Sequence, residues 1–300
     1  MSVQTTKAVL KTFLTNGESD VLALTGTWGT GKTYAWHQAL TEHQSSIKFK
    51  HYCYVSLFGI KNMAELRMAL FTKTVAIATL GKTLDLASIN EHWASLTKDW
   101  LKAQCARWQP VLKSLPYGSS VSLGLEALAP TAVRDTLICL DDFERQTSID
   151  AADILGLITE LSEERGCKVA LIFNADQLAN KETYRAYREK AIDYEVLYAP
   201  TVHEAFDLVF TDDFPHRTQI LRHVVELGLT NVRILRKLRQ LFELILPVIA
   251  PLHTAVADSS ISTTVLFCWC AYAQASSKPN LAEIEKWNSW LVVKRQEVVS

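Results

Sequence analysis

Residues Gly26-Thr27-Trp28-Gly29-Thr30-Gly31-Lys32-Thr33 decide the fold of this chain. They match the pattern G-x-x-x-x-G-K-[ST], a glycine-rich loop that cradles phosphate groups when it joins a strand to a helix. The apolar run from Asp20 to Thr25 before the loop is typical of a strand that is buried on both faces. After the loop, Lys32 to Gln44 has a helical pattern. A chance match would arise in about one chain in a hundred of this size, and the flanking strand and helix make chance a poorer explanation still.

Each residue type in the loop has a chemical reason to be there. Glycines allow backbone angles at which consecutive N–H groups point inward at phosphate oxygens, and the N-terminus of the following helix adds its positive dipole end. Lys32 then reaches the β and γ phosphates, and the Thr33 hydroxyl is placed to bind Mg²⁺, which prefers oxygen ligands. The nucleotide-binding segment predicted from these residues comprises Gly26, Thr27, Trp28, Gly29, Thr30, Gly31, Lys32, Thr33 and Tyr34.

A second apolar strand, Thr136 to Leu140, ends in the acids Asp141 and Asp142. Alone this is a weak signal, since a turn or a helix cap explains many such pairs, but a phosphate loop upstream favours a metal site. We expect Asp141 to be the outer-sphere magnesium ligand and Asp142 to orient or deprotonate the attacking water. Glu144 is the reserve candidate for that base. Arg145 either pairs with one of these acids or faces a neighbouring subunit, and the ion pair is favoured.

The composition restricts the classes of function. The formal net charge is −1, so no global positive field holds nucleic acid through its phosphates, and nucleic-acid binding is not indicated. No segment offers about 18 consecutive apolar residues, so no membrane span is expected. The start, Met1-Ser2-Val3-Gln4, lacks the features of a signal peptide. We therefore expect a cytoplasmic protein, whose six scattered cysteines remain reduced thiols.

Strands that alternate with helices predict the α/β class, with a parallel sheet between two helical layers and binding at the carboxyl ends of its strands. Residues 1–200 form the predicted core, interrupted by a helical insertion at about 62–130, and residues 201–300 form a predicted C-terminal helical lid. The further strands are expected at about 50–57, 168–173 and 195–198. The main helices outside the insertion are expected at about 5–15, 150–165, 177–191, 203–209, 215–227, 232–245, 261–275 and 282–294.

With both phosphate-site motifs in view, the chain resembles the KAP family of P-loop NTPases, which are related to AAA+ and STAND ATPases. Trp28 inside the loop is the discriminating residue, and the segments Tyr54-Val55-Ser56-Leu57-Phe58-Gly59 and Lys168 to Asn174 are similar to the same core. The resemblance implies an additional strand between the phosphate-loop strand and the acidic strand. Many KAP proteins carry membrane-spanning helices between the two motifs, whereas the insertion here is too polar to span a bilayer.

The resemblance also implies nucleotide-sensing residues. Asn174 takes the position of a polar sensor that hydrogen-bonds the water or the γ-phosphate, although it could equally be a strand-end cap. Asn231 to Lys237 is similar to the family's helical-lid motif, in which we favour Arg233 as the nucleotide-sensing arginine; a solvated basic helix face is the competing interpretation. Arg185, Arg188 and Lys190 are weaker candidates for an arginine finger.

The leading hypothesis is an ATPase that uses ATP and Mg²⁺ as a conformational switch, binding ATP or ADP together with a protein partner or another copy of itself. ATP is preferred to GTP because the sequence has no N-K-x-D guanine-reading signature. Some bacterial relatives serve in anti-phage defence, which gives one possible context. A nucleotide-dependent interaction scaffold with little turnover is the main alternative, because it would use the same loop. A nucleic-acid translocase is disfavoured, because the best basic cluster, Arg233 to Arg239, is short.

Overall fold

The computed structural model describes residues 1–79, 133–179 and 181–272. These residues form two compact units. Of the described residues, Met1, Val3–Thr27 and those within Lys32–Ala199 form the core unit, and Ser2, Trp28–Gly31 and those from Pro200 to Tyr272 form the helical unit. The phosphate loop is thus divided, since its two ends belong to the core unit and its apex, Trp28–Gly31, belongs to the helical unit.

The core unit contains a six-stranded sheet in the order β3-β2-β4-β5-β1-β6. All neighbouring strands pair in parallel except β2 and β3. The expected parallel sheet is therefore confirmed in the main, and β5 lies between the strand before the phosphate loop and the strand that ends in acid. The strands are β1 (Val21–Thr25), β2 (His51–Ser56), β3 (Thr74–Ala76), β4 (Thr136–Asp141), β5 (Lys168–Phe173) and β6 (Tyr194–Leu197).

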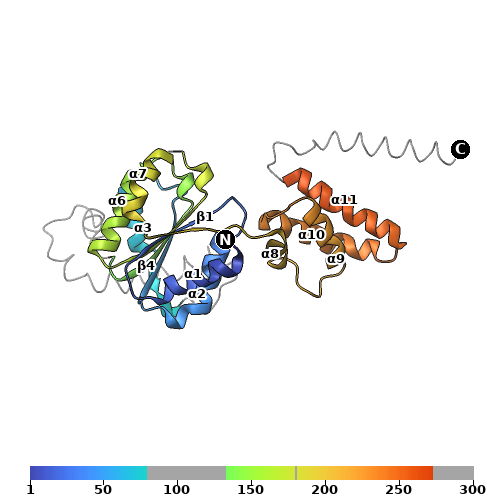
Figure 1. The fold of residues 1–300 in the computed structure, drawn as a ribbon, viewed down its shortest axis with the longest axis horizontal. Helices are drawn as coiled ribbons and strands as arrows, with labels where there is room; N and C mark the ends of the chain where they lie inside the picture. The colour runs from blue at the N-terminus through green and yellow to red at the C-terminus, as the bar shows by residue number, and fades with distance from the viewer. Residues whose placement is uncertain (80–132, 180, 273–300) are drawn as a thin grey trace, which may run out of the picture. The chain divides into compact units, whose positions relative to one another are not determined.

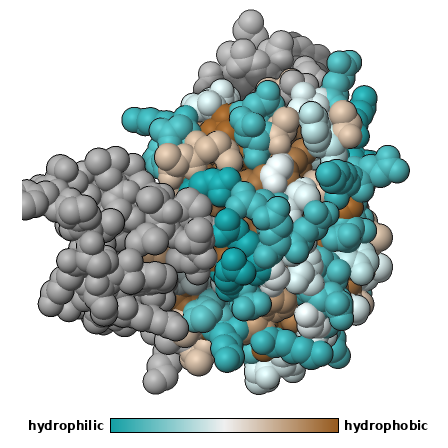
Figure 2. Space-filling view, turned by 90° about the vertical axis from the view of Figure 1, so that its left-hand side faces the viewer, coloured by the Kyte–Doolittle hydropathy of each residue, from teal (hydrophilic) through white to brown (hydrophobic). Residues whose placement is uncertain are grey.

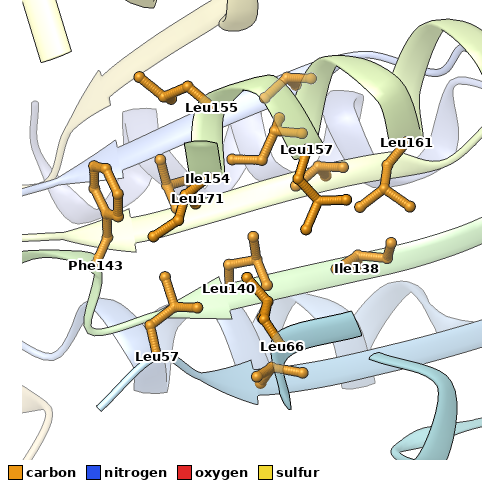
Figure 3. Close-up of a cluster of buried hydrophobic side chains, with 14 of the residues drawn as sticks. Leu57, Leu66, Ile138, Leu140, Phe143, Ile154, Leu155, Leu157, Leu161 and Leu171 are labelled. Carbon is orange, nitrogen blue, oxygen red and sulfur yellow. The ribbon is translucent and has the colours of Figure 1, made fainter. Parts of the chain in front are cut away.

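Helices cover both faces of this sheet (Figure 1). Alternate strand residues point to opposite faces, so Leu22 and Leu24 pack toward one helical layer while Val21 and Ala23 pack toward the other. In the second layer, Figure 3 shows side chains of α6 meeting those of β4 and β5. The first layer holds α1 (Val3–Thr15) and α2 (Lys32–His43), and the second holds α3 (Met63–Thr72), α6 (Ala151–Thr159) and α7 (Lys181–Ala191).

One predicted helix is too long. At the start of the predicted helical insertion, the sequence has a helical pattern from Asn62 to Leu80. In the structure α3 ends at Thr72 and the chain continues as β3, antiparallel to β2. The β-branched residues Thr74 and Val75 suit a strand, and their side chains are buried. β3 follows α3 after Lys73 alone and pairs with the edge of β2. A three-residue edge strand thus lies where the periodicity had suggested about two more helical turns.

The helical unit has its own apolar core. It is built on two paired phenylalanines, Phe206 and Phe210, whose rings stack 4.3 Å apart, and on the buried stripe of α10 that includes Leu235 and Leu238. Its helices are α8 (Val202–Asp207), α9 (Arg217–Glu226), α10 (Val232–Ile249) and α11 (Thr254–Tyr272). The predicted insertion beyond residue 79 and the predicted helix at 282–294 lie outside the described residues.

The surface of the described residues is mainly polar on the face shown in Figure 2, where apolar residues are visible only in small patches between hydrophilic ones. Within 1–79, 133–179 and 181–272, no helix combines the length and the apolar character needed to cross a bilayer. The five cysteines in those ranges are buried thiols.

Candidate functional site

The two ends of the phosphate loop are fixed by the sheet and by α2. Gly26 follows β1 directly and has φ +152°. A Cβ atom at this position would lie 2.4 Å from the backbone oxygen of Tyr198, which is far inside the van der Waals distance. Glycine is therefore required here for close packing of two backbone segments as well as for its backbone angle.

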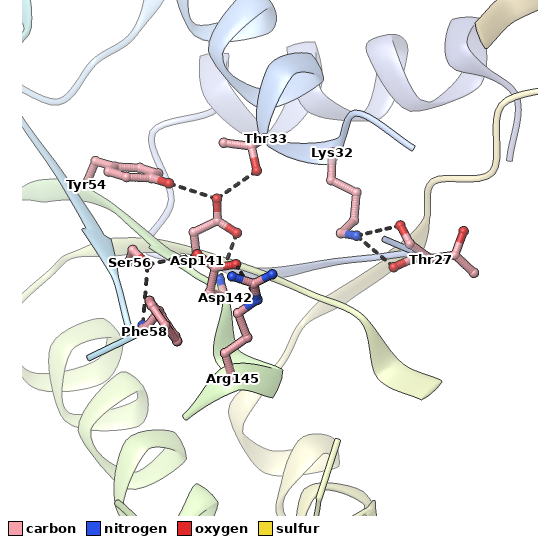
Figure 4. Close-up of polar contacts among 10 residues, drawn as sticks. Thr27, Lys32, Thr33, Tyr54, Ser56, Phe58, Asp141, Asp142 and Arg145 are labelled. Atoms are coloured by element: carbon pink, nitrogen blue, oxygen red, sulfur yellow. Dashed lines mark hydrogen bonds and ion pairs between the residues drawn. The ribbon is translucent and has the colours of Figure 1, made fainter. Parts of the chain in front are cut away.

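Lys32 begins α2 and is largely buried. Its Nζ donates hydrogen bonds to the carbonyl oxygens of Gly26 at 2.7 Å and Thr27 at 3.0 Å. The ammonium group thus lies inside the curve of the loop, as Figure 4 shows. This is the place from which a lysine can reach phosphate groups bound by the same loop. The next two residues, Thr33 and Tyr34, are half-buried in the first turn of α2.

The Thr33 hydroxyl and the Asp141 carboxylate meet at the carboxyl edge of the sheet (Figure 4). Thr33 Oγ1 donates to Asp141 Oδ2 at 2.7 Å, and Tyr54 Oη donates to the same oxygen at 2.9 Å. The other oxygen, Oδ1, accepts the backbone N–H of Asp142 at 2.8 Å. The first turn of α2 and the end of β4 thus place the hydroxyl and the carboxylate together, as the two motifs predicted.

Burial and hydrogen bonding have opposing effects on the pKa of Asp141. Desolvation raises the pKa of this carboxyl group above its ordinary value, while the hydrogen bonds from Thr33 and Tyr54 work in the opposite direction. A hydroxyl oxygen beside a carboxylate also supplies the kind of oxygen ligands that Mg²⁺ prefers. The residues present therefore fit a magnesium ion held by Thr33, with Asp141 behind it.

Asp142 adopts a left-handed backbone conformation, with φ 59° and ψ 35°. Non-glycine residues rarely adopt this conformation, and it is often found at functional sites. Ser56 Oγ donates to Asp142 Oδ2 at 2.8 Å, and Arg145 Nε lies 3.6 Å from Oδ1. Both carboxylate oxygens of the candidate base are therefore engaged in this conformation, and Arg145 makes the ion pair favoured from the sequence.

The other two candidates lie near the same edge of the sheet. Glu144 is buried in the short 3₁₀-helix Phe143–Arg145, directly after the acid pair. Asn174 follows β5 and is also buried, and its Oδ1 accepts the backbone N–H of Asp176 at 3.1 Å. Asn174 thus makes a strand-end cap, which was the alternative to a sensor role in the sequence analysis. Arg188, a candidate finger, pairs with Glu195 at 2.8 Å.

The loop apex is bound within the helical unit, to which residues 28–31 belong. Asn231 Nδ2 donates to the carbonyl oxygen of Trp28 at 3.3 Å, and the backbone N–H of Val232 donates to that of Gly29 at 2.7 Å. Trp28 is exposed, whereas Thr30 is buried; Gly29 and Gly31 have φ of +80° and +95°. Arg233, favoured from the sequence, is exposed, and only its backbone N–H contacts Asn231.

The sequence did not single out three residues that the structure connects to the site. Tyr54 and Ser56 donate to the two acids, and Asn231 contacts the loop apex. The signal for the first two was the alternation of polar side chains along β2, which places Tyr52, Tyr54 and Ser56 on one face. The signal for Asn231 was its place before a helix, where asparagine is a preferred cap, but no local pattern indicates that its amide also reaches the loop.

No protein-family model and no curated protein matches the sequence. Three similar solved structures are Cdc6p from Pyrobaculum aerophilum, with 14% identity and a TM-score of 0.44; Drosophila ORC bound to DNA, with 10% and 0.46; and a RuvB variant from Thermotoga maritima, with 12% and 0.44. The matches cover 79%, 91% and 98% of this chain. The chain spans 59%, 60% and 76% of the respective proteins. At this low similarity the matches carry no inference about activity.

Proposed function

We propose that this chain is an ATPase of KAP type that hydrolyses ATP with Mg²⁺. The observation that carries the proposal is the hydrogen bond of 2.7 Å between Thr33 and Asp141, which joins the end of the glycine-rich loop to the acidic end of β4. A hydroxyl and a buried carboxylate meet there, and Lys32 precedes Thr33 with its Nζ held by the carbonyl oxygens of the loop. These are the parts that phosphoryl transfer requires.

Each residue has a separate role in this proposal. Lys32 neutralises the β and γ phosphates, and the backbone N–H groups of the loop hold them in place. Bound Mg²⁺ would supply charge neutralisation on the phosphate oxygens, with Thr33 as a ligand and Asp141 behind its waters. Asp142 orients or deprotonates the attacking water once its carboxylate is released from Ser56 and Arg145.

The remaining parts of the proposal concern regulation. Asn174 acts as the sensor of the γ-phosphate through its amide Nδ2, while its Oδ1 makes the strand-end cap. Arg233 acts as the nucleotide-sensing arginine of the lid. Nucleotide binding then orders the lid, and hydrolysis resets its contacts with a protein partner or a second copy. Anti-phage defence is one cellular context in which such a switch would operate.

A scaffold with little turnover is the second candidate, because a specific observation favours it. Asp142 is held on both oxygens, by Ser56 at 2.8 Å and by Arg145 at 3.6 Å. While protein groups engage both oxygens, the carboxylate is poorly placed to accept a proton from water. If the arrangement persists with nucleotide bound, the chain would bind ATP and hydrolyse it slowly.

Phosphate release from ATP and binding of a non-hydrolysable ATP analogue together test the proposal. We expect wild type to bind the analogue and release phosphate, Asp142→Asn to bind with turnover lowered about a hundredfold or more, and Lys32→Ala to do neither. Equal, near-background release by wild type and Asp142→Asn, with analogue binding retained, would leave only the scaffold. Failure of wild type to bind any nucleotide would remove both candidates.

A further inference from the structure

Asn231 makes two kinds of contact at once, all within the helical unit. Its Oδ1 accepts the backbone N–H groups of Arg233 at 3.0 Å and Ile234 at 3.3 Å, which caps the N-terminus of α10. Its Nδ2 donates to the carbonyl oxygen of Trp28. A capping residue needs only an acceptor. Serine or aspartate would cap this helix as well, so capping alone does not account for the donor that reaches the loop.

The contact between the loop and Asn231 requires glycine at position 29. This glycine occupies a position that the phosphate-loop pattern leaves open to any residue. A Cβ atom here would lie 2.2 Å from Asn231 Oδ1 and 2.4 Å from both Cγ and Nδ2, so any side chain would overlap the amide. The φ of +80° also favours glycine. The close approach to Asn231 therefore explains a third glycine that phosphate binding does not require.

The two hydrogen bonds fix the orientation of two peptide groups. In a trans peptide the carbonyl of one residue and the N–H of the next point in opposite directions. The carbonyls of Trp28 and Gly29 point to Asn231 Nδ2 and to the N–H of Val232. The N–H groups of Gly29 and Thr30 are consequently turned away from the first turn of α10. Backbone N–H groups at the apex of a phosphate loop are the groups that contact phosphate oxygens.

We propose that Asn231 is a positioning residue for the phosphate loop, which holds the Gly29 and Thr30 amides in the orientation that binds the nucleotide phosphates. This inference rests on the proposed nucleotide site and adds a residue that acts on it through the loop backbone. It also gives a physical link between nucleotide binding and α10, because a change in the loop apex alters the two hydrogen bonds at the start of that helix.

Asn231→Ser and Asn231→Asp test this role, because both retain a capping oxygen and lose the amide donor. Serine is neutral, and aspartate keeps the shape of asparagine. We expect both to weaken binding of a non-hydrolysable ATP analogue with Mg²⁺ by roughly three- to tenfold, as the loss of one hydrogen bond implies. The matched control is Asn62→Ser, since Asn62 caps α3 through its bond from Glu65 N and lies in the core unit. It should bind within twofold of wild type.

A double-variant cycle separates positioning from simple loss of stability. Gly29→Ala places a methyl group against the Asn231 amide, and Asn231→Ser removes that amide. We therefore expect the second substitution to weaken binding less in the Gly29→Ala background than in wild type. Helix content by circular dichroism should match wild type in the Asn231 variants.

Three outcomes decide the matter. Weakened binding in both Asn231 variants with a non-additive cycle supports the inference. If wild type binds the analogue and both Asn231 variants bind as tightly, the inference is overturned and the proposed function stands. If wild type binds no nucleotide, the proposed function fails and the positioning role fails with it.

Discussion

Strand β2 supplies two hydroxyl donors to the acid pair, Tyr54 and Ser56. Tyr54 shares Asp141 Oδ2 with Thr33, and its ring packs against the ring of His37 at 5.3 Å. Burial, followed by the charge of Asp141, raises the pKa of the Tyr54 hydroxyl far above its ordinary value. The hydroxyl is therefore a permanent donor at any pH at which the protein is folded, and it can hold the carboxylate in place while Thr33 turns toward a metal.

Tyr54→Phe should raise the Mg²⁺ concentration needed for half-maximal ATP hydrolysis about three- to tenfold, the effect of one lost hydrogen bond of about 1 kcal/mol. Removing the hydroxyl takes away one of the two side-chain hydrogen bonds to Asp141 Oδ2, while the ring that packs on His37 is retained. The measurement is turnover against Mg²⁺ concentration at saturating ATP.

Tyr52→Phe is the matched control for that substitution. Tyr52 lies two residues earlier on the same face of β2 and is fully buried, but its hydroxyl pairs with Trp36 Nε1 at 2.9 Å. It should lower stability and leave the Mg²⁺ dependence unchanged. Equal shifts in the two variants would mean that Tyr54 acts through packing alone.

At the scale of elements, an ion-pair group joins α3 to the short helical segment Glu160–Glu164 that follows α6. Glu160 accepts from Arg67 of α3 at 2.8 Å and from Arg165 at 2.5 Å. The hydrogen bond from Arg67 is the main cause that lowers the pKa of Glu160 below its ordinary 4.5. The contribution to stability is therefore present above pH 4.5 and is lost as the pH falls through the lower pKa of the folded state.

Glu160→Gln should destabilise the core unit by about 1 kcal/mol at pH 7, since the group is partly solvated and its ion pairs are screened. The difference in unfolding free energy between wild type and variant should shrink below pH 4.5, where the Glu160 carboxylate of wild type becomes protonated. Urea denaturation at pH 7 and pH 4 measures both values. Glu164→Gln, an exposed acid in the same segment, is the control and should have little effect at either pH; a deficit of equal size at both pH values would contradict the ion-pair explanation.

The elements differ in how far the sequence determines them. Strands β1, β4 and β5 could be predicted because buried parallel strands are continuous apolar runs, and the loop after β1 has its own pattern. β3 could not, because three residues at a sheet edge carry too little periodicity to outweigh the helical pattern around them. Within the site, Lys32, Thr33 and Asp141 follow from spacing. The donors Tyr54, Ser56 and Asn231 do not, because each contact joins residues at least 85 positions apart in the chain.

At the scale of the whole molecule, a buried histidine makes the free energy of unfolding of the core unit depend on pH. His37 lies on α2, and burial lowers its pKa from 6.5 to about 4. The folded state thus keeps the ring neutral where the unfolded chain would protonate it. Between pH 6.5 and about 4 the unfolded state binds more protons, so the free energy of unfolding falls as the pH falls. Above pH 6.5 the ring is neutral in both states, and the penalty is absent.

His37→Gln should therefore remove part of the acid sensitivity of the core unit. Between pH 7 and pH 5, wild type should lose about 2 kcal/mol more unfolding free energy than the variant, the equivalent of about 1.5 pKa units. Hydrogen exchange of the buried β1 and β4 amides, corrected for intrinsic rates, measures this opening separately from the helical unit. His43→Gln, at the end of the same helix, should keep the wild-type slope. A loss of slope in both variants would place the acid sensitivity elsewhere in α2, whereas a loss confined to His37→Gln ties it to the ring that packs against Tyr54.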